Sequence, residues 1–139
     1  MEKNTGAPEL RMIPTRIDNY GSLSIIEGDQ AIPFEIKRIY YLHGVPVDAT
    51  RGSHSHKELF QFMIPVSGSF RINLETSTQS YEFELNDPSI GLYIPPGYWR
   101  TLTNFTDGSV CLVLASKEFD ESDYIRDFDV FLSWSRNRD

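Results

Sequence analysis

Short β-rich runs, separated at close intervals by turn residues, extend over most of this 139-residue chain. Gly28-Asp29, Asn86-Asp87-Pro88 and Pro95-Pro96-Gly97 separate them, because glycine, proline and asparagine suit the backbone angles of turns. No segment before residue 117 has an apolar repeat of 3.6 residues. Many short strands at this spacing predict an all-β sandwich or small barrel. Strands are expected near Arg11–Arg16, Leu23–Glu27, Phe34–Leu42, Leu59–Ser67, Ser69–Glu75, Ser80–Leu85, Gly91–Ile94, Arg100–Asn104 and Val110–Ser116.

Alternation of polar and apolar residues assigns the two faces of the expected strand Phe34–Leu42. The more apolar face should point into the barrel, and it holds Phe34, Ile36, Arg38, Tyr40 and Leu42. The tail from Phe119 to Asp139 is ambiguous: residues 121–124 could open a helical turn, and residues 129–132 could form a short helix or an edge strand.

Length and composition predict one domain, residues 1–139, with its core in about residues 10–130. The net charge of −7 argues against nucleic-acid binding, which needs a basic patch. No run approaches the roughly 20 apolar residues of a membrane span, and the start of the chain has no apolar signal region. A cytoplasmic protein is therefore expected, with the single Cys111 as a buried structural thiol.

His54 and His56 are two of only three histidines, and they stand two residues apart before a strand-like stretch. Residues i and i+2 of an extended segment point to the same face, so both imidazoles should enter one pocket. Two nitrogen ligands for a metal and two acid–base groups for one substrate both fit this spacing. A structural role, with neighbours satisfying both rings, is the third alternative.

Two motifs resemble those of the cupin superfamily, which implies a jelly-roll barrel. The first motif is represented by His54, His56, Gln61 and Gly68, and the second by Pro95, Gly97, Arg100 and Asn104. In metal-binding cupins a glutamate and a histidine stand where this chain has Gln61 and Arg100. A neutral amide and a permanent cation are poor metal ligands. The substitutions favour a site without metal or cofactor that uses the histidines in acid–base chemistry on an anionic substrate or enolate.

Further runs resemble the sugar-nucleotide 3,4-ketoisomerases: Arg51 to Lys57, Ser67-Gly68-Ser69, Gly91 to Pro96, Trp99-Arg100, Gly108 to Ser116 and Tyr124 to Asp127. The resemblance implies conversion of dTDP-4-keto-6-deoxyglucose to a 3-keto sugar through an enediol. His54 is then expected as the main base and His56 as a second acid–base or orienting group. Tyr40 would assist the proton transfer, and Arg100 would stabilise the oxyanion.

The same resemblance implies the substrate contacts and partners. The expected diphosphate ligands are Arg51, Arg100 and Arg126. Trp99 is a candidate to stack on thymine, and Gln61 is a further pocket residue. The pair Tyr20 and Arg100 favours the gluco over the galacto product. N-terminal strands exchanged between two subunits would make a homodimer, and an aminotransferase would consume the 3-keto product.

Three other functions are weighed against this one. A sugar-nucleotide 3,5-epimerase also uses a histidine base, but no obvious strand-borne His–Asp pair of that type is visible in the sequence. A non-catalytic sugar-nucleotide-binding cupin would not need two imidazoles in one pocket. A metal-dependent cupin would need the ligands that Gln61 and Arg100 replace.

Overall fold

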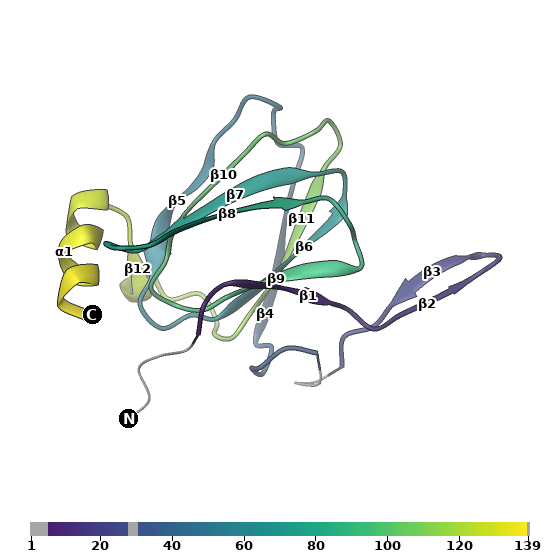
Figure 1. Cartoon of the computed structure of the whole chain (residues 1–139), viewed down its shortest axis with the longest axis horizontal. Coiled ribbons are helices and arrows are strands. Elements are labelled where there is room, and N and C mark those ends of the chain that lie inside the picture. Colours follow the sequence, from purple (N-terminus) through teal and green to yellow (C-terminus); the bar gives the residue numbers. More distant parts are fainter. Residues whose placement is uncertain (1–5, 28–30, 139) are drawn as a thin grey trace.

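The computed structural model describes residues 6–27 and 31–138, and its strands form two five-stranded antiparallel sheets and a separate hairpin (Figure 1). The first sheet has the order β1-β9-β6-β11-β4, which is Glu9–Met12, Ile90–Ile94, Gln61–Ser67, Val110–Ala115 and Arg38–His43. The second has the order β12-β5-β10-β7-β8, which is Tyr124–Ile125, Arg51–His56, Trp99–Thr103, Phe70–Glu75 and Ser80–Leu85. The hairpin pairs β2 (Thr15–Asp18) with β3 (Gly21–Ser24). This is the all-β jelly roll that the turn spacing and the cupin resemblance predict.

Apolar side chains that alternate along the strands fill the space between the two sheets. On β6, Met63 belongs to the core between the sheets, whereas Phe62 and Ile64 belong to a second cluster. On β11, Cys111 and Val113 point into that core. Cys111 is a free thiol with 1% exposure, which confirms the expectation of a buried thiol, and this burial raises its pKa to about 12.

The second cluster covers the other face of the first sheet, and it corrects one expectation. Phe34 and Ile36 pack there with Phe62 and Ile64, so they do not share the barrel interior with Tyr40. The physical reason is that β4 begins only at Arg38, so the two-residue alternation does not extend back to Phe34.

Several element boundaries also differ from the expectation. The strand expected over residues 11–16 is divided between β1 and β2, with Pro14 between them. Residues 51–56, expected only to be extended, form the full strand β5. The ambiguous tail contains a 3₁₀ turn, η1 (Glu121–Asp123), and a helix, α1 (Phe128–Arg138). No helix in the described ranges is long and apolar enough to cross a membrane.

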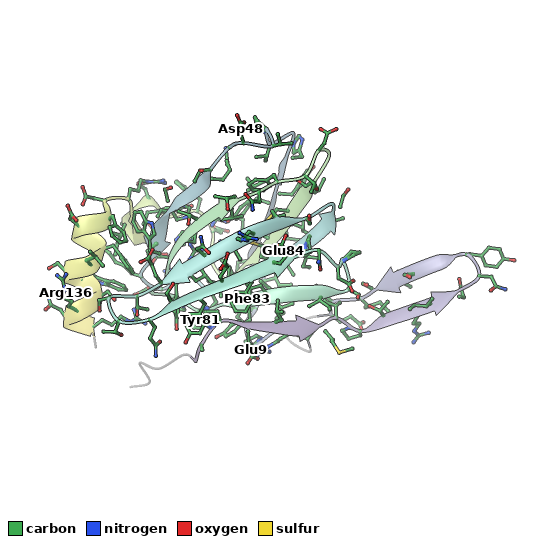
Figure 2. All side chains as sticks on the ribbon, turned by 45° about the horizontal axis from the view of Figure 1, so that its top comes forward. Glu9, Asp48, Tyr81, Phe83, Glu84 and Arg136 are labelled. Carbon is green, nitrogen blue, oxygen red and sulfur yellow. The ribbon has the colours of Figure 1, made fainter. Side chains whose placement is uncertain are left out.

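The β2–β3 hairpin projects from the barrel on the side opposite α1 (Figure 1). In Figure 2 its side chains stand apart from the packed side chains of the two sheets. Ile17 is 78% exposed and Leu23 is 59% exposed. An exposed apolar hairpin of this kind is a surface that a second molecule can cover.

Candidate active site

A cavity of about 510 Å³ opens between the two sheets. Its apolar wall includes Leu42, Met63, Leu102 and Val113. Its polar lining comes from strands β4, β5, β10 and β12 and the residues beside them: Arg38, Tyr40, Arg51, His54, Arg100, Tyr124 and Arg126. The cavity therefore has the make-up of a small-molecule site, apolar with a few convergent polar groups.

A β-bulge directs His54 into this cavity. Arg100 pairs with His54 across the strands, but the next residue of β10, Thr101, pairs with Gly52, so Ser53 is the extra residue. Gly52 has φ +88° and Ser53 has φ 59°. A side chain on Gly52 would also press on the backbone oxygen of Arg100, 3.0 Å from the added Cβ. Bulges of this kind re-aim side chains beside active sites, and here His54 lies directly opposite Arg100.

The tautomer of His54 follows from its backbone partner. Its Nδ1 lies 3.1 Å from the carbonyl oxygen of Gly52, which can only accept a hydrogen bond. Nδ1 therefore carries the proton and Nε2 keeps its lone pair. Burial, and then the positive charge of Arg100, lower the pKa of His54 to about 4. His54 is thus a neutral imidazole with a free acceptor nitrogen at neutral pH.

His56 lies behind His54 and does not line the cavity. Its ring is 4.9 Å from that of His54 and 4.3 Å from that of Tyr124, between ring centroids, and its side chain is only 1% exposed. Nδ1 contacts the Asp123 carboxylate at 3.2 Å, and that carboxylate also accepts the backbone N–H of Glu58 at 2.8 Å. Burial, and then Arg100, lower the pKa of His56, so a neutral ring donates Nδ1–H to Asp123.

Tyr40, Gln61 and Arg100 form one hydrogen-bonded group. The Gln61 amide nitrogen lies 2.8 Å from the Tyr40 hydroxyl, and Arg100 Nη1 donates to the Gln61 amide oxygen. Burial lowers the pKa of Arg100 only to about 10, so its guanidinium stays charged. Burial raises the pKa of Tyr40, so its phenol keeps its proton.

Four arginines line the cavity of a chain whose net charge is −7: Arg38, Arg51, Arg100 and Arg126. No carboxylate belongs to the cavity lining in the described part of the chain. Arg126 is exposed, pairs with Glu121 at 2.7 Å and lies 4.1 Å from the Tyr124 ring centroid. Such a concentration of guanidinium groups suits an anionic ligand.

Three residues predicted for substrate binding lie elsewhere than expected. Trp99 is buried with Ile125 and Phe131 beside α1 and does not line the cavity, so it cannot stack on a base there. Gln61 is 1% exposed, and both ends of its amide have protein partners. Tyr20 is 98% exposed between β2 and β3 and does not line the cavity, and that hairpin projects away from the barrel (Figure 1).

Asp123 and Tyr124 are site residues that the sequence did not single out. They reach the histidines because the two-residue strand β12 pairs with β5, placing Tyr124 opposite His56. A strand this short has no alternation pattern to detect. Within the described ranges, no three His, Cys, Asp or Glu side chains are grouped so that they could hold a metal ion.

Residues 7–136 match a protein family described as FdtA: WxcM-like, C-terminal. A curated relative from Aneurinibacillus thermoaerophilus, TDP-4-oxo-6-deoxy-alpha-D-glucose-3,4-oxoisomerase, is 42% identical over 115 residues, or 83% of each protein.

Two solved structures are also similar. The 3,4-ketoisomerase QdtA from Thermoanaerobacterium thermosaccharolyticum is 46% identical, with a TM-score of 0.92 over 94% of this chain and 95% of QdtA. That structure is an asparagine-for-histidine variant in complex with TDP-4-keto-6-deoxyglucose. A second QdtA variant, with arginine for a tyrosine and histidine for an arginine, holds TDP. WlaRB from Campylobacter jejuni, a TDP-quinovose 3,4-ketoisomerase, is 41% identical, with a TM-score of 0.86 over 91% of this chain and 97% of WlaRB.

Proposed function

Because the chain belongs to the FdtA family (WxcM-like, C-terminal), we propose that it is a sugar-nucleotide 3,4-ketoisomerase that acts on TDP-4-keto-6-deoxyglucose. The observation that carries this proposal is the cavity in which His54, a neutral base, lies opposite Arg100. The named relatives, at 41–46% identity, are 3,4-oxoisomerases or 3,4-ketoisomerases of TDP-linked or related sugars. The histidine, tyrosine and arginine replaced in QdtA are spaced along its chain as His54, Tyr20 and Arg100 are along this one.

The diphosphate of the substrate is assigned to the arginines at the cavity. Arg51 is exposed, and Arg126 is exposed and already oriented by Glu121. Arg38 lines the same cavity, and its Nε atom is buried without a hydrogen-bond partner among the described residues. Guanidinium groups can bind phosphate oxygens through two parallel hydrogen bonds. We assign diphosphate binding to Arg51 and Arg126, with Arg38 as an additional contact.

His54 removes the proton from C3 in this mechanism. The electron pair of the C3–H bond forms a C3=C4 double bond, and the C4 ketone becomes an enolate oxygen. Arg100 stabilises that negative charge, and the Tyr40 hydroxyl donates to the same oxygen. The reaction is completed when C4 receives a proton, the O3 hydroxyl loses its proton and the ketone forms at C3. No atom or electron is gained or lost overall, so the reaction needs no redox cofactor.

His56 supports His54 in this scheme. It is held by Asp123 and is buried between His54 and Tyr124. A ring with 1% exposure is placed to orient its neighbour or to pass a proton to it, rather than to contact the sugar.

The gluco product is proposed over the galacto product. The proton must reach one face of C4, so the groups that flank this carbon decide the stereochemistry. The Tyr20 and Arg100 pair of this chain is the gluco type by family resemblance. The 41% identity to a TDP-quinovose ketoisomerase, an enzyme named for a 6-deoxyglucose, supports the same outcome.

A homodimer in which the β2–β3 hairpins are exchanged is part of the proposal. A groove of about 720 Å³ lies between the hairpin and the outer face of the first sheet. Apolar side chains from both sides line it, including Ile17, Ile39, Ile64 and Leu112. A second copy of the chain would bury this surface and would bring its own Tyr20 to the cavity that Tyr20 cannot reach within one subunit.

We also propose that an aminotransferase acts next on the 3-keto sugar and that the protein acts in the cytoplasm. Both rest on the family resemblance, since a 3-keto sugar is a substrate suited to amination.

The decisive experiment is a proton NMR time course in D₂O with TDP-4-keto-6-deoxyglucose and metal-stripped protein. Growth of a 3-keto product with deuterium at C4 is expected, and coupling constants after reduction of C3 distinguish gluco from galacto. Exchange at C3 and C5 without migration of the ketone would identify an epimerase. No exchange, with TDP still bound, would identify a binding protein.

A further inference from the structure

Gln61 is the one member of the polar group at the cavity that the mechanism above leaves without a task. It occupies the position at which metal-binding cupins carry a carboxylate ligand. It is 1% exposed and does not line the cavity. Both its amide oxygen and its amide nitrogen contact neighbouring side chains, Arg100 and Tyr40.

The direction of each hydrogen bond in this group follows from chemistry alone. A guanidinium has only donors, so the Gln61 atom that Arg100 contacts must be the amide oxygen. The amide nitrogen then faces Tyr40 and must donate, because an amide NH₂ has no acceptor. The Tyr40 hydroxyl is therefore the acceptor at 2.8 Å, and its own proton must point away from Gln61.

The hydroxyl proton of Tyr40 faces the cavity. Tyr40 lines the cavity wall, and the guanidinium of Arg38, whose carbon lies 5.2 Å from the Tyr40 ring centroid, offers no acceptor. A carboxylate in place of Gln61 would reverse this arrangement. It would still accept from Arg100, but its second oxygen would draw the Tyr40 proton toward itself.

We infer that Gln61 is a positioning residue: its amide presents Tyr40 to the substrate as a hydrogen-bond donor. This inference rests on the proposed ketoisomerase activity, because the group served by the donor is the C4 oxygen. It also gives a physical reason for an amide at this position. Only a side chain that accepts at one end and donates at the other can join an arginine to a tyrosine and leave the tyrosine proton free.

The kinetic test compares Gln61→Glu with Tyr40→Phe and with the double variant. In Gln61→Glu an oxygen replaces the amide NH₂ group. The resulting carboxylate is paired with Arg100, so the fold should be retained. We expect kcat to fall about 10²-fold in each single variant, since a positioned acid–base group contributes roughly this much. In the Tyr40→Phe background the same Gln61→Glu change should lower kcat by less than about tenfold, because the hydroxyl on which it acts is gone.

Two kinetic outcomes would overturn the inference. One is a Gln61→Glu enzyme with the kcat of the wild type. The other is a double variant whose losses multiply in full, because Gln61 would then act independently of Tyr40. A role confined to stability would instead lower the melting temperature and leave kcat of the folded fraction unchanged, which also counts against the inference.

An NMR titration tests the same arrangement without using activity. In protein labelled with ¹³C at tyrosine Cζ, Tyr40 can be assigned by its absence in Tyr40→Phe. Gln61→Glu should raise the pKa of Tyr40, because a carboxylate accepts from the phenol and repels the phenolate, and Gln61→Met should raise it less. An unchanged pKa in Gln61→Glu would reject the hydrogen-bond direction inferred here. If the wild type proved inactive on the ketosugar, only the proposed function would fail, and this titration would still decide the role of Gln61.

Discussion

A single backbone carbonyl decides what His54 can do. The oxygen of Gly52 holds Nδ1–H, so Nε2 is the nitrogen available to accept a proton. Replacing His54 by Asn removes that base but keeps a polar side chain of smaller size. We expect kcat to fall by at least about 10²-fold, with folding and TDP binding retained because the arginines are untouched. Circular dichroism and calorimetry with TDP provide the control, and an active His54→Asn enzyme would contradict the assignment.

The lowered pKa of His54 predicts an unusual acid limb in the pH profile. The base must be neutral, so kcat/KM should fall only when pH drops toward the pKa of about 4. A histidine with its ordinary pKa of about 6.5 would already be half protonated at pH 6.5. Because kcat/KM reports the free enzyme, it should stay level from pH 8 to about pH 5.5. A midpoint at or above pH 6.5 would contradict the neutral, desolvated state of His54.

Residue chemistry could be predicted from the sequence where it depends on spacing along one strand. His54 and His56 lie two apart on β5 and their rings contact each other, but only His54 lines the cavity that both were expected to enter. The partner of His56 could not be predicted, because Asp123 is 67 residues away and reaches it through a 3₁₀ turn and a two-residue strand. The burial of Trp99 could not be predicted either, because its side chain packs against a helix whose existence the sequence left open.

At the scale of the elements, the close approach of β6 and β9 depends on Gly91. A Cβ on Gly91 would lie 2.3 Å from the ring of Phe62, which is fully buried. Gly91→Ala should lower the free energy of unfolding by about 1–3 kcal/mol, the usual cost of overpacking a core. Urea unfolding measures this change. Adding Phe62→Leu should recover part of the loss, whereas purely additive losses would show that the contact is not the cause.

Most strand positions could be predicted from the sequence because turn residues mark the strand ends. β5 and β12 lie where no strand was expected, and one expected strand is divided between β1 and β2. Which side chains of a strand face the core could be predicted only where the two-residue alternation of the strand is uninterrupted, as on β11, where Cys111 and Val113 point inward. Alternation misled at Phe34 and Ile36, since an irregular segment lies before β4 and packs outside the barrel. The bulge at Ser53, which directs His54, has no pattern in the sequence beyond a nearby glycine.

At the scale of the whole molecule, net charge and local charge have opposite signs. The chain carries −7 overall, yet its cavity has four arginines and no acidic lining residue in the described ranges. The net charge argues against a nucleic-acid ligand but says nothing about a small anion. Recognition of such an anion depends on which arginines the two sheets bring together.

The proposed exchange of hairpins makes a prediction that only an assembly of two chains can meet. The activity to measure is formation of the gluco product. Tyr20→Ala homodimers should lose it because Tyr20 flanks C4, and His54→Asn homodimers should lose it because the base is missing. In a heterodimer of these variants, purified through two different tags, one site would combine His54 of one chain with Tyr20 of the partner subunit. That heterodimer should recover about half of the wild-type activity, because one of the two sites of a symmetric dimer is complete. If both residues came from the same chain, each site of the heterodimer would still lack one group, and no activity would return. Sedimentation of the purified species provides the control, because the rescue requires a dimer and should disappear if the chains separate.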